Sequence, residues 1–245
     1  QAWHLGKIVE CGAQVIEPRE GQDCIIGTLQ DGYFEVEPGH PEKNCTKTRV
    51  AAHTLYENPL PHELKEPSGV LDSSRCSFQQ IDPRTVRVSG SSFLPTENYT
   101  VKLEGVRKVG YRSIFIAGVR DPILIERFDS FSEACRIRTR EQVGNLGISD
   151  SNYTVTFRTY GRGAVMGDRE FVKNDDCPIE LCVIGEVIAD NEAISRAVLA
   201  KARYSLLHTD FEGRFCISGN LAFPFSPSDI SVGEVYDFSV WHTLE

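Results

Sequence analysis

The stretch NYTVKLEG, which begins at Asn98, returns further along the chain as NYTVTFRTYG, which begins at Asn152. In both copies apolar and polar side chains alternate after the asparagine, as in a strand with one buried face. A second, more apolar strand and then an amphipathic helix are expected after each copy. The doubled phrase therefore predicts two units of strand, strand and helix, over residues 98–143 and 152–208.

In the first copy, Gly105 and Gly110 are expected to bracket a turn between the two strands. The second strand is SIFIAGV, residues 113–119. Asp121 is the predicted N-cap of the helix, and Pro122 suits its first position. A stripe of apolar side chains at helical spacing follows: Leu124, Phe128, Phe131 and Cys135.

The second copy repeats this order. A glycine-marked loop, GRGAVMG at residues 161–167, separates the first strand from IELCVIGEVIA at residues 179–189. Asp190 is the predicted N-cap of the helix. The helical stripe that follows consists of Ala193, Ala197, Ala200, Tyr204 and Leu207.

These patterns predict an α+β fold with antiparallel sheets and helices packed on one face. Two copies are fewer than a solenoid needs, so we expect a pseudo-symmetric pair of hairpin-plus-helix units. We divide the chain into an N-terminal portion, residues 1–97, and the repeated portion, residues 98–245. The first is expected to hold a join segment, a helix over residues 46–57 and a hairpin that turns at Asp82. Two more strands are predicted in the second, over residues 213–220 and 233–244.

Composition restricts the partners. The net charge of −9 over 245 residues argues against nucleic acid or an anionic membrane surface. No apolar run approaches the roughly 18 residues that span a bilayer. The eight cysteines include no C-x-x-C pair, so we expect reduced, mostly buried thiols, no metal, no cofactor and a cytoplasmic protein. Because the only methionine is Met166, we also expect that something preceded residue 1.

The segment AAHTLYE suggests proton-transfer chemistry. His53, Tyr56 and Glu57 are spaced to share one face of a helix. A histidine beside a carboxylate is a plausible acid–base pair near neutral pH. The alternative is an ordinary polar helix face, and the residues alone leave both open.

Three arginines are candidate receivers of an anionic substrate, because a guanidinium binds a carboxylate or phosphate through two hydrogen bonds. Arg112 and Arg120 flank the apolar strand of the first copy, and Arg162 lies in the glycine loop. Gly161 and Gly163 would allow backbone amides to approach the anion. The alternatives are a local ion pair, with Asp121 for example, and a plain hairpin turn.

Asn220 ends the segment ISGN. Its amide is a candidate donor to a substrate carbonyl oxygen. The alternative is that it holds its own loop.

Several long segments together resemble the acyclic terpene utilisation AtuA-type family. They are AAHTLYENP, IDPRTVRVSGS, YTVKLEGVRKVGYRSIFIAGVRDP, YGRGAVMG and GNLAFPFSPSDISVGEVYDFSV. The likeness runs from about His4 to the C-terminus. Family members usually carry a further N-terminal α/β domain, so the resemblance implies that this chain corresponds to their C-terminal part. It also has Gly163-Ala164 where relatives often have an asparagine-glycine pair.

The resemblance implies a metabolic setting more than a particular reaction. The genes of bacterial relatives lie near genes for enzymes that degrade acyclic terpenes through acyl-CoA intermediates. The first hypothesis is an enzyme, or its acyl-binding part, that acts on a carboxylic acid or acyl-CoA by hydration, lyase or isomerase chemistry. The second is a non-catalytic half that completes a site with a separate N-terminal domain or in a homo-oligomer.

Overall fold

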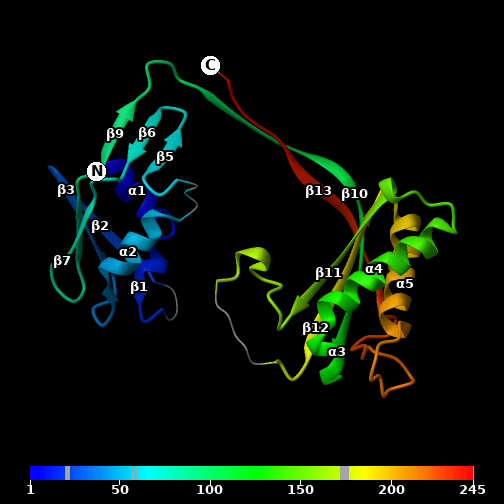
Figure 1. Ribbon diagram of the computed structural model, residues 1–245. Coiled ribbons are helices and arrows are strands. Elements are labelled where there is room, and N and C mark those ends of the chain that lie inside the picture. Colours follow the sequence, from blue (N-terminus) through cyan, green and yellow to red (C-terminus); the bar gives the residue numbers. More distant parts are fainter. Residues whose placement is uncertain (20–22, 57, 59, 172–176, 245) are drawn as a thin grey trace. The chain divides into compact units, whose positions relative to one another are not determined.

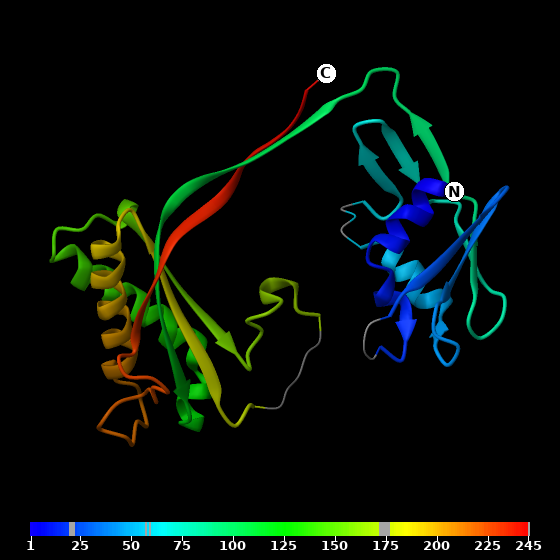
Figure 2. The same cartoon turned by 180° about the vertical axis from the view of Figure 1, so that it is seen from behind.

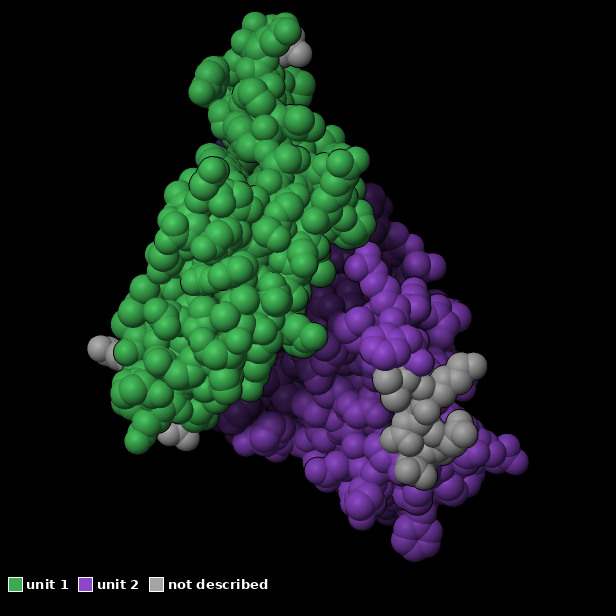
Figure 3. All heavy atoms as spheres, turned by 90° about the vertical axis from the view of Figure 1, so that its left-hand side faces the viewer, with its two compact units in different colours: residues 1–103, 241–245 green, residues 104–240 purple. Residues whose placement is uncertain are grey.

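The computed structural model describes residues 1–19, 23–56, 58, 60–171 and 177–244 (Figures 1 and 2). It contains two compact units (Figure 3). Unit 1 comprises Gln1–Leu103 and the residues from Trp241 onward, and unit 2 comprises Glu104–Val240. The strand pairs whose register is described are antiparallel. The predicted α+β class with antiparallel sheets is therefore confirmed.

Unit 1 packs two helices with short sheets. The helices are α1 (Ala2–Glu10) and α2 (Lys47–Thr54). A four-stranded sheet has the order β2-β3-β8-β7, with β2 Ile25–Gln30, β3 Tyr33–Pro38, β8 Val86–Ser89 and β7 Ser77–Gln80. A three-stranded sheet consists of β5 (Glu63–Glu66), β6 (Gly69–Asp72) and β9 (Ser92–Pro95), and β1 (Ile16–Glu17) pairs with β4 (Asn44–Cys45).

Unit 1 has a helix and a hairpin where the sequence predicts them, although the helix ends at Thr54 and does not extend to residue 57. The Thr46 side chain accepts a hydrogen bond from the Arg49 amide and so caps α2. The Asp82 carboxylate accepts from the amides of Arg84, at 2.7 Å, and Thr85, at 2.9 Å. This Asx-type turn closes the predicted hairpin of β7 and β8.

Unit 2 is built on one four-stranded sheet. In chain order its elements are β10 (Val101–Val119, which begins in unit 1), α3 (Pro122–Glu126), α4 (Phe128–Gly144), β11 (Tyr153–Tyr160), β12 (Leu181–Ala189), α5 (Glu192–His208) and β13 (Asp229–Leu244). The strand order is β11-β12-β10-β13. With one strand inserted between the two strands that each helix connects, this is the split βαβ arrangement of ferredoxin-like folds.

The helices of unit 2 lie on one side of this sheet (Figures 1 and 2). Phe115 on β10 and Val183 on β12 point toward them and are fully buried against Phe128 and Leu199. Successive strand residues point to opposite faces. Residues one position along these strands therefore lie on the other face, which none of the described helices covers.

Helix starts in unit 2 follow the sequence closely. The Asp121 carboxylate caps α3, as predicted, by accepting from the amides of Ile123 and Leu124. The second prediction is off by one residue, because Asn191 and not Asp190 caps α5. Asp190 instead accepts a hydrogen bond of 2.6 Å from the side-chain amide of Asn152, so the carboxylate ties the loop before α5 to the start of β11.

The predicted hairpin of the first copy is wrong. Residues 101–119 form a single strand that runs through both Gly105 and Gly110. The partner comes from the far end of the chain, since β13 pairs with β10. A β-carbon on Gly105 would lie 3.3 Å from the Val240 Cβ, so glycine here allows close approach of β13 and makes no turn. The second copy does fold as a hairpin, β11 with β12, followed by α5.

Two further predictions are corrected. Residues 213–220 form turns and no strand, because Asn220 ties this segment back to the end of α5. The cysteines are free thiols, but most are not buried: only Cys45 and Cys135 are, and Cys24, Cys177, Cys182 and Cys216 are exposed.

Candidate functional site

The face of the unit 2 sheet without helices carries a cluster of three charged side chains. Glu186 lies in the middle of β12, and its carboxylate is almost fully buried, with the side chain 11% exposed. Arg112 of β10 approaches one oxygen (Nε to Oε1, 2.6 Å), and Arg158 of β11 approaches the other (Nη2 to Oε2, 3.0 Å). Two guanidiniums therefore share one carboxylate, and the cluster keeps an excess of positive charge.

The register explains how one carboxylate reaches two arginines. In β10, Ile114 lies opposite Glu186, and Arg112 is the next residue on the same face. In β11, Thr156 lies opposite Glu186, and Arg158 is the next residue on that face. The two arginines approach from the two neighbouring strands and remain 35% and 50% exposed, so donor groups stay available to solvent.

Apolar side chains surround this cluster on the same face. They are half-buried and come from β10 and β12: Ile114, Ile116, Ile184 and Ile188. A cationic cluster next to an apolar surface is suited to a molecule with an anionic head and a hydrocarbon tail. Aliphatic carboxylates have this form.

Sequence reasoning identified Arg112 but missed Glu186 and Arg158. A signal was present, because Glu186 is the one acidic or basic residue within the apolar strand LCVIGEVIA. A charge that is buried in a strand needs an opposite charge nearby. Arg112 becomes a partner through the strand order and Arg158 through the register of the hairpin, and the local pattern contains neither.

The predicted arginines of the loops bind main-chain carbonyl groups. Arg120 donates to the carbonyl oxygen of Ile179 at 2.9 Å. Arg162 donates to the carbonyl oxygens of Ile125 and Glu126 at the end of α3, and it forms an ion pair of 3.2 Å with Asp129. A cation at this position satisfies the carbonyl groups that a helix leaves free at its C-terminus.

Gly161 and Gly163 adopt left-handed backbone conformations, with φ of +95° and +80°. The chain turns sharply at both positions after β11, which explains the glycines without a ligand. Asn220 donates its side-chain amide to the carbonyl oxygens of Leu206 (2.9 Å) and Thr209 (2.8 Å) and thereby closes the end of α5. Both glycines and Asn220 therefore have structural tasks within unit 2.

The predicted proton-transfer residues lie in unit 1. His53 is buried near the end of α2, and its ring stacks on that of Tyr56, with centroids 5.3 Å apart and planes 15° from parallel. Tyr56 follows the helix and is 40% exposed. Glu57 lies outside the described residues. The candidates thus form two groups, one in each unit.

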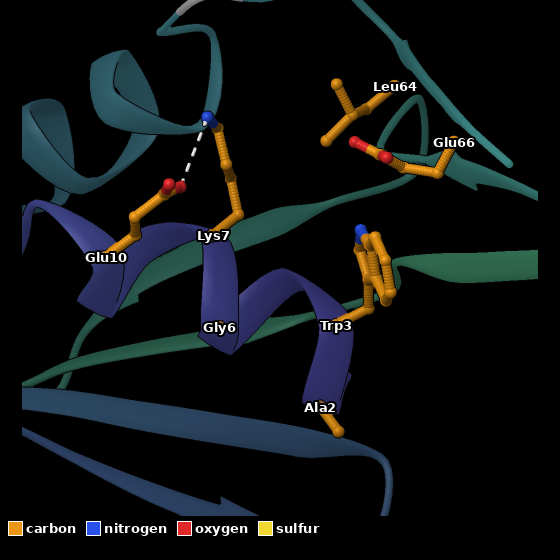
Figure 4. Close-up of a pocket in the computed structure, with 7 residues that line it drawn as sticks. All are labelled: Ala2, Trp3, Gly6, Lys7, Glu10, Leu64 and Glu66. Carbon is orange, nitrogen blue, oxygen red and sulfur yellow. Dashed lines mark ion pairs between the residues drawn. The ribbon is translucent and has the colours of Figure 1, made fainter. Parts of the chain in front are cut away.

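A groove of about 640 Å³ lies in unit 1, between α1 and β5. Its lining consists of Ala2, Trp3, Gly6, Lys7, Glu10, Leu64 and Glu66 (Figure 4). Lys7 pairs with Glu10 at 3.5 Å, and its ammonium also lies 5.7 Å from the centre of the Tyr56 ring. Tyr56 is therefore close to a lining residue of this groove, although it does not line the groove itself.

A buried polar cluster links α1, which carries His4, to α2, which carries Thr54. His4 is fully buried, and its Nε2 lies 3.0 Å from the Thr54 hydroxyl oxygen. Burial, with a smaller contribution from the positively charged N-terminus, lowers the pKa of His4 to about 4. The Cys76 thiol lies 3.7 Å from the Nδ1 of His4, and burial raises its pKa. A neutral imidazole beside a protonated thiol indicates a structural cluster and not a reactive one.

The described ranges lack both a metal-binding cluster of side chains and a helix that could span a membrane. Within them, no group of three or more His, Cys, Asp or Glu side chains is placed to hold a metal ion. Every helix in this part of the chain is too short or too polar to cross a bilayer.

The comparison with known families identifies the chain. The sequence profile of the acyclic terpene utilisation family protein AtuA matches residues 1–206. The chain therefore belongs to the AtuA family. No match was found among curated proteins or among solved structures.

Proposed function

We propose that this chain is the acyl-binding part of an enzyme that acts on a carboxylic acid or an acyl-CoA, by hydration, lyase or isomerase chemistry. The observation that carries the proposal is the pair of arginines, Arg112 and Arg158, held by Glu186 on a sheet face that none of the described helices of unit 2 covers. Family membership supports an aliphatic substrate, since the family takes its name from the use of acyclic terpenes.

The arginine pair suits a carboxylate for a geometric reason. Glu186 occupies one side of each guanidinium, and the part-exposed remainder keeps further N–H donors. A substrate carboxylate between the two arginines would complete an alternating arrangement of two positive and two negative groups. The hydrocarbon chain would then lie along Ile114 and Ile184 on the same face.

The other candidates keep distinct roles in this proposal. In unit 1, His53, Tyr56 and Glu57 remain proposed proton-transfer residues, separate from the acyl-binding face of unit 2, because a histidine and a carboxylate can exchange protons near neutral pH. Arg120, Arg162 and Asn220 would shape the loops at the end of the sheet, because they bind carbonyl groups of the main chain.

A second function is favoured by the shape of the same face. Ligand sites bury most of the surface of a small molecule, whereas a sheet face contacts a ligand from one side only. A second surface would have to close the site. This supports the alternative that the chain is a non-catalytic half, completed by a separate N-terminal α/β domain or by another copy.

The test is ligand binding to the full chain, with octanoate and octanoyl-CoA as probes. NMR spectra of isoleucine methyl groups should show shifts for Ile114, Ile116, Ile184 and Ile188. Octylamine, which has the same tail and the opposite charge, should not produce them.

Two matched variants make the test specific. Arg158→Gln should weaken octanoate binding about tenfold, the loss expected for one charge-assisted pair. Arg140→Gln removes an arginine on α4 that is 70% exposed and pairs with Asp150, and it should leave binding unchanged. Shifts at other methyl groups, or equal loss in both variants, would reject the sheet face as the acyl site.

A further inference from the structure

Over the first half of β10, one edge of the strand is paired with no other strand among the described residues. β12 pairs with β10 only from Tyr111 to Val119. Before Tyr111, β10 continues beside β13 alone, beyond the ends of β11 and β12 (Figures 1 and 2). Within the part of the chain that the structure describes, no strand binds the other edge of residues 101–110.

This two-stranded arm exposes large apolar side chains. In β10 they are Val101 (60% exposed), Leu103 (38%), Val106 (60%) and Val109 (38%). In β13 they include Tyr236 (55%) and Phe238 (61%). Two strands alone are marginally stable in water, and an open edge with apolar residues favours the addition of another strand.

We propose that the free edge of β10 pairs, antiparallel, with the same edge of a second copy of this chain, about a two-fold axis at Val106. The sequence VKLEGVRKVG, residues 101–110, is complementary to itself in this register. Leu103 lies opposite Val109 of the second copy, and Glu104 lies opposite its Lys108. Val106 lies opposite itself.

The matched pairs also fall on consistent faces. Residues opposite each other in an antiparallel pair share a face, and their side chains contact. Glu104, Val106 and Lys108 alternate along one face of β10, so that face would carry an apolar pair between two ion pairs. Lys108 already bonds Glu234 at 2.6 Å, and a second carboxylate would share its ammonium.

The neighbouring register is less favourable. With the axis between Gly105 and Val106, Glu104 would lie opposite Arg107, but Leu103 would lie opposite Lys108. Both apolar matches would be lost. Charged side chains on an edge normally oppose pairing, so their complementarity about Val106 argues for a specific partner, a second copy, and against indiscriminate association.

The test begins with the mass of the full chain in solution, by sedimentation or by light scattering after size exclusion. A dimer is expected. Val106→Lys and Val106→Glu each place like charges opposite each other at the axis and should weaken the dimer about tenfold or more. Both should remain folded by circular dichroism, because Val106 is 60% exposed. Val165→Lys, at a loop valine that is 79% exposed, is the control and should leave the dimer intact.

Mixing the two axis variants tests the register. The Val106→Lys chain and the Val106→Glu chain should form a heterodimer, because a lysine then lies opposite a glutamate. A monomeric wild-type chain would overturn the proposal, as would an axis variant that still dimerises like the wild type. Two folded monomers that fail to combine would overturn the axis at Val106.

Discussion

Neighbouring residues of β12 show how differently the two faces of the unit 2 sheet are built. A β-carbon on Gly185 would point toward the helices, but the Phe115 ring already fills that space. Glu186 points away from the helices and binds Arg112 and Arg158. One face is specified by close packing and the other by charge. The alternation of a strand thus lets consecutive residues serve the fold and the candidate site separately.

The largest expected difference between the faces concerns packing. Phe115→Ala removes a fully buried ring and should lower the free energy of unfolding by about 4 kcal/mol, from lost burial and the remaining cavity. Ile114→Ala, one position along on the other face, should cost about 1 kcal/mol because that side chain is only half-buried. Urea denaturation followed by circular dichroism measures both values. Similar costs would mean that the second face is covered as well.

Unit 1 offers a similar comparison between a buried histidine, His4, and an exposed one, His62. The pKa of His4 is about 4 in the folded chain and about 6.5 when unfolded, so the unfolded state binds more protons between these values. The stabilisation is complete above pH 6.5 and is lost as the pH falls toward 4. The shift corresponds to about 3 kcal/mol.

The measurement is urea denaturation of the full chain at several pH values, followed by tryptophan fluorescence, since Trp3 and Trp241 both belong to unit 1. His4→Leu should remove most of the dependence on pH between 6.5 and 4. His62→Gln, at an exposed imidazole, should retain it. If both variants kept the full dependence, another group would be responsible.

In unit 2, local sequence signals predicted where helices and strands lie better than they predicted which strands pair with each other. The cap at Asp121 and the alternation after Asn152 were correct, because both depend on residues close in the chain. The turn at Gly105 was wrong because a glycine signal cannot distinguish a turn from close approach of a distant strand. That strand, β13, follows more than a hundred residues later.

The candidate site divides in the same way. Arg112 was proposed from its place beside an apolar strand, but the carboxylate that holds it was not. Glu186 and Arg158 lie on the two strands of the predicted hairpin, but the long loop between those strands leaves open the register that brings the two side chains together. Arg162 and Asn220 looked available in sequence, but each binds carbonyl groups that a helix end leaves free. Such carbonyl groups cannot be assigned before the helix is placed.

The smallest expected change in stability concerns the charged face itself. Glu186→Gln removes the carboxylate and leaves two guanidiniums close together. The cost should be only about 1 kcal/mol, because Arg112 and Arg158 are partly exposed and water screens their repulsion.

The diagnostic result for the Glu186→Gln variant is its response to sulfate, which should raise the melting temperature of this variant more than that of the wild type. An anion can then occupy the place of the lost carboxylate. Glu133→Gln, which disrupts the exposed pair with Arg136, should respond to sulfate as the wild type does. Equal responses in all three proteins would mean that the two arginines do not act together on an anion.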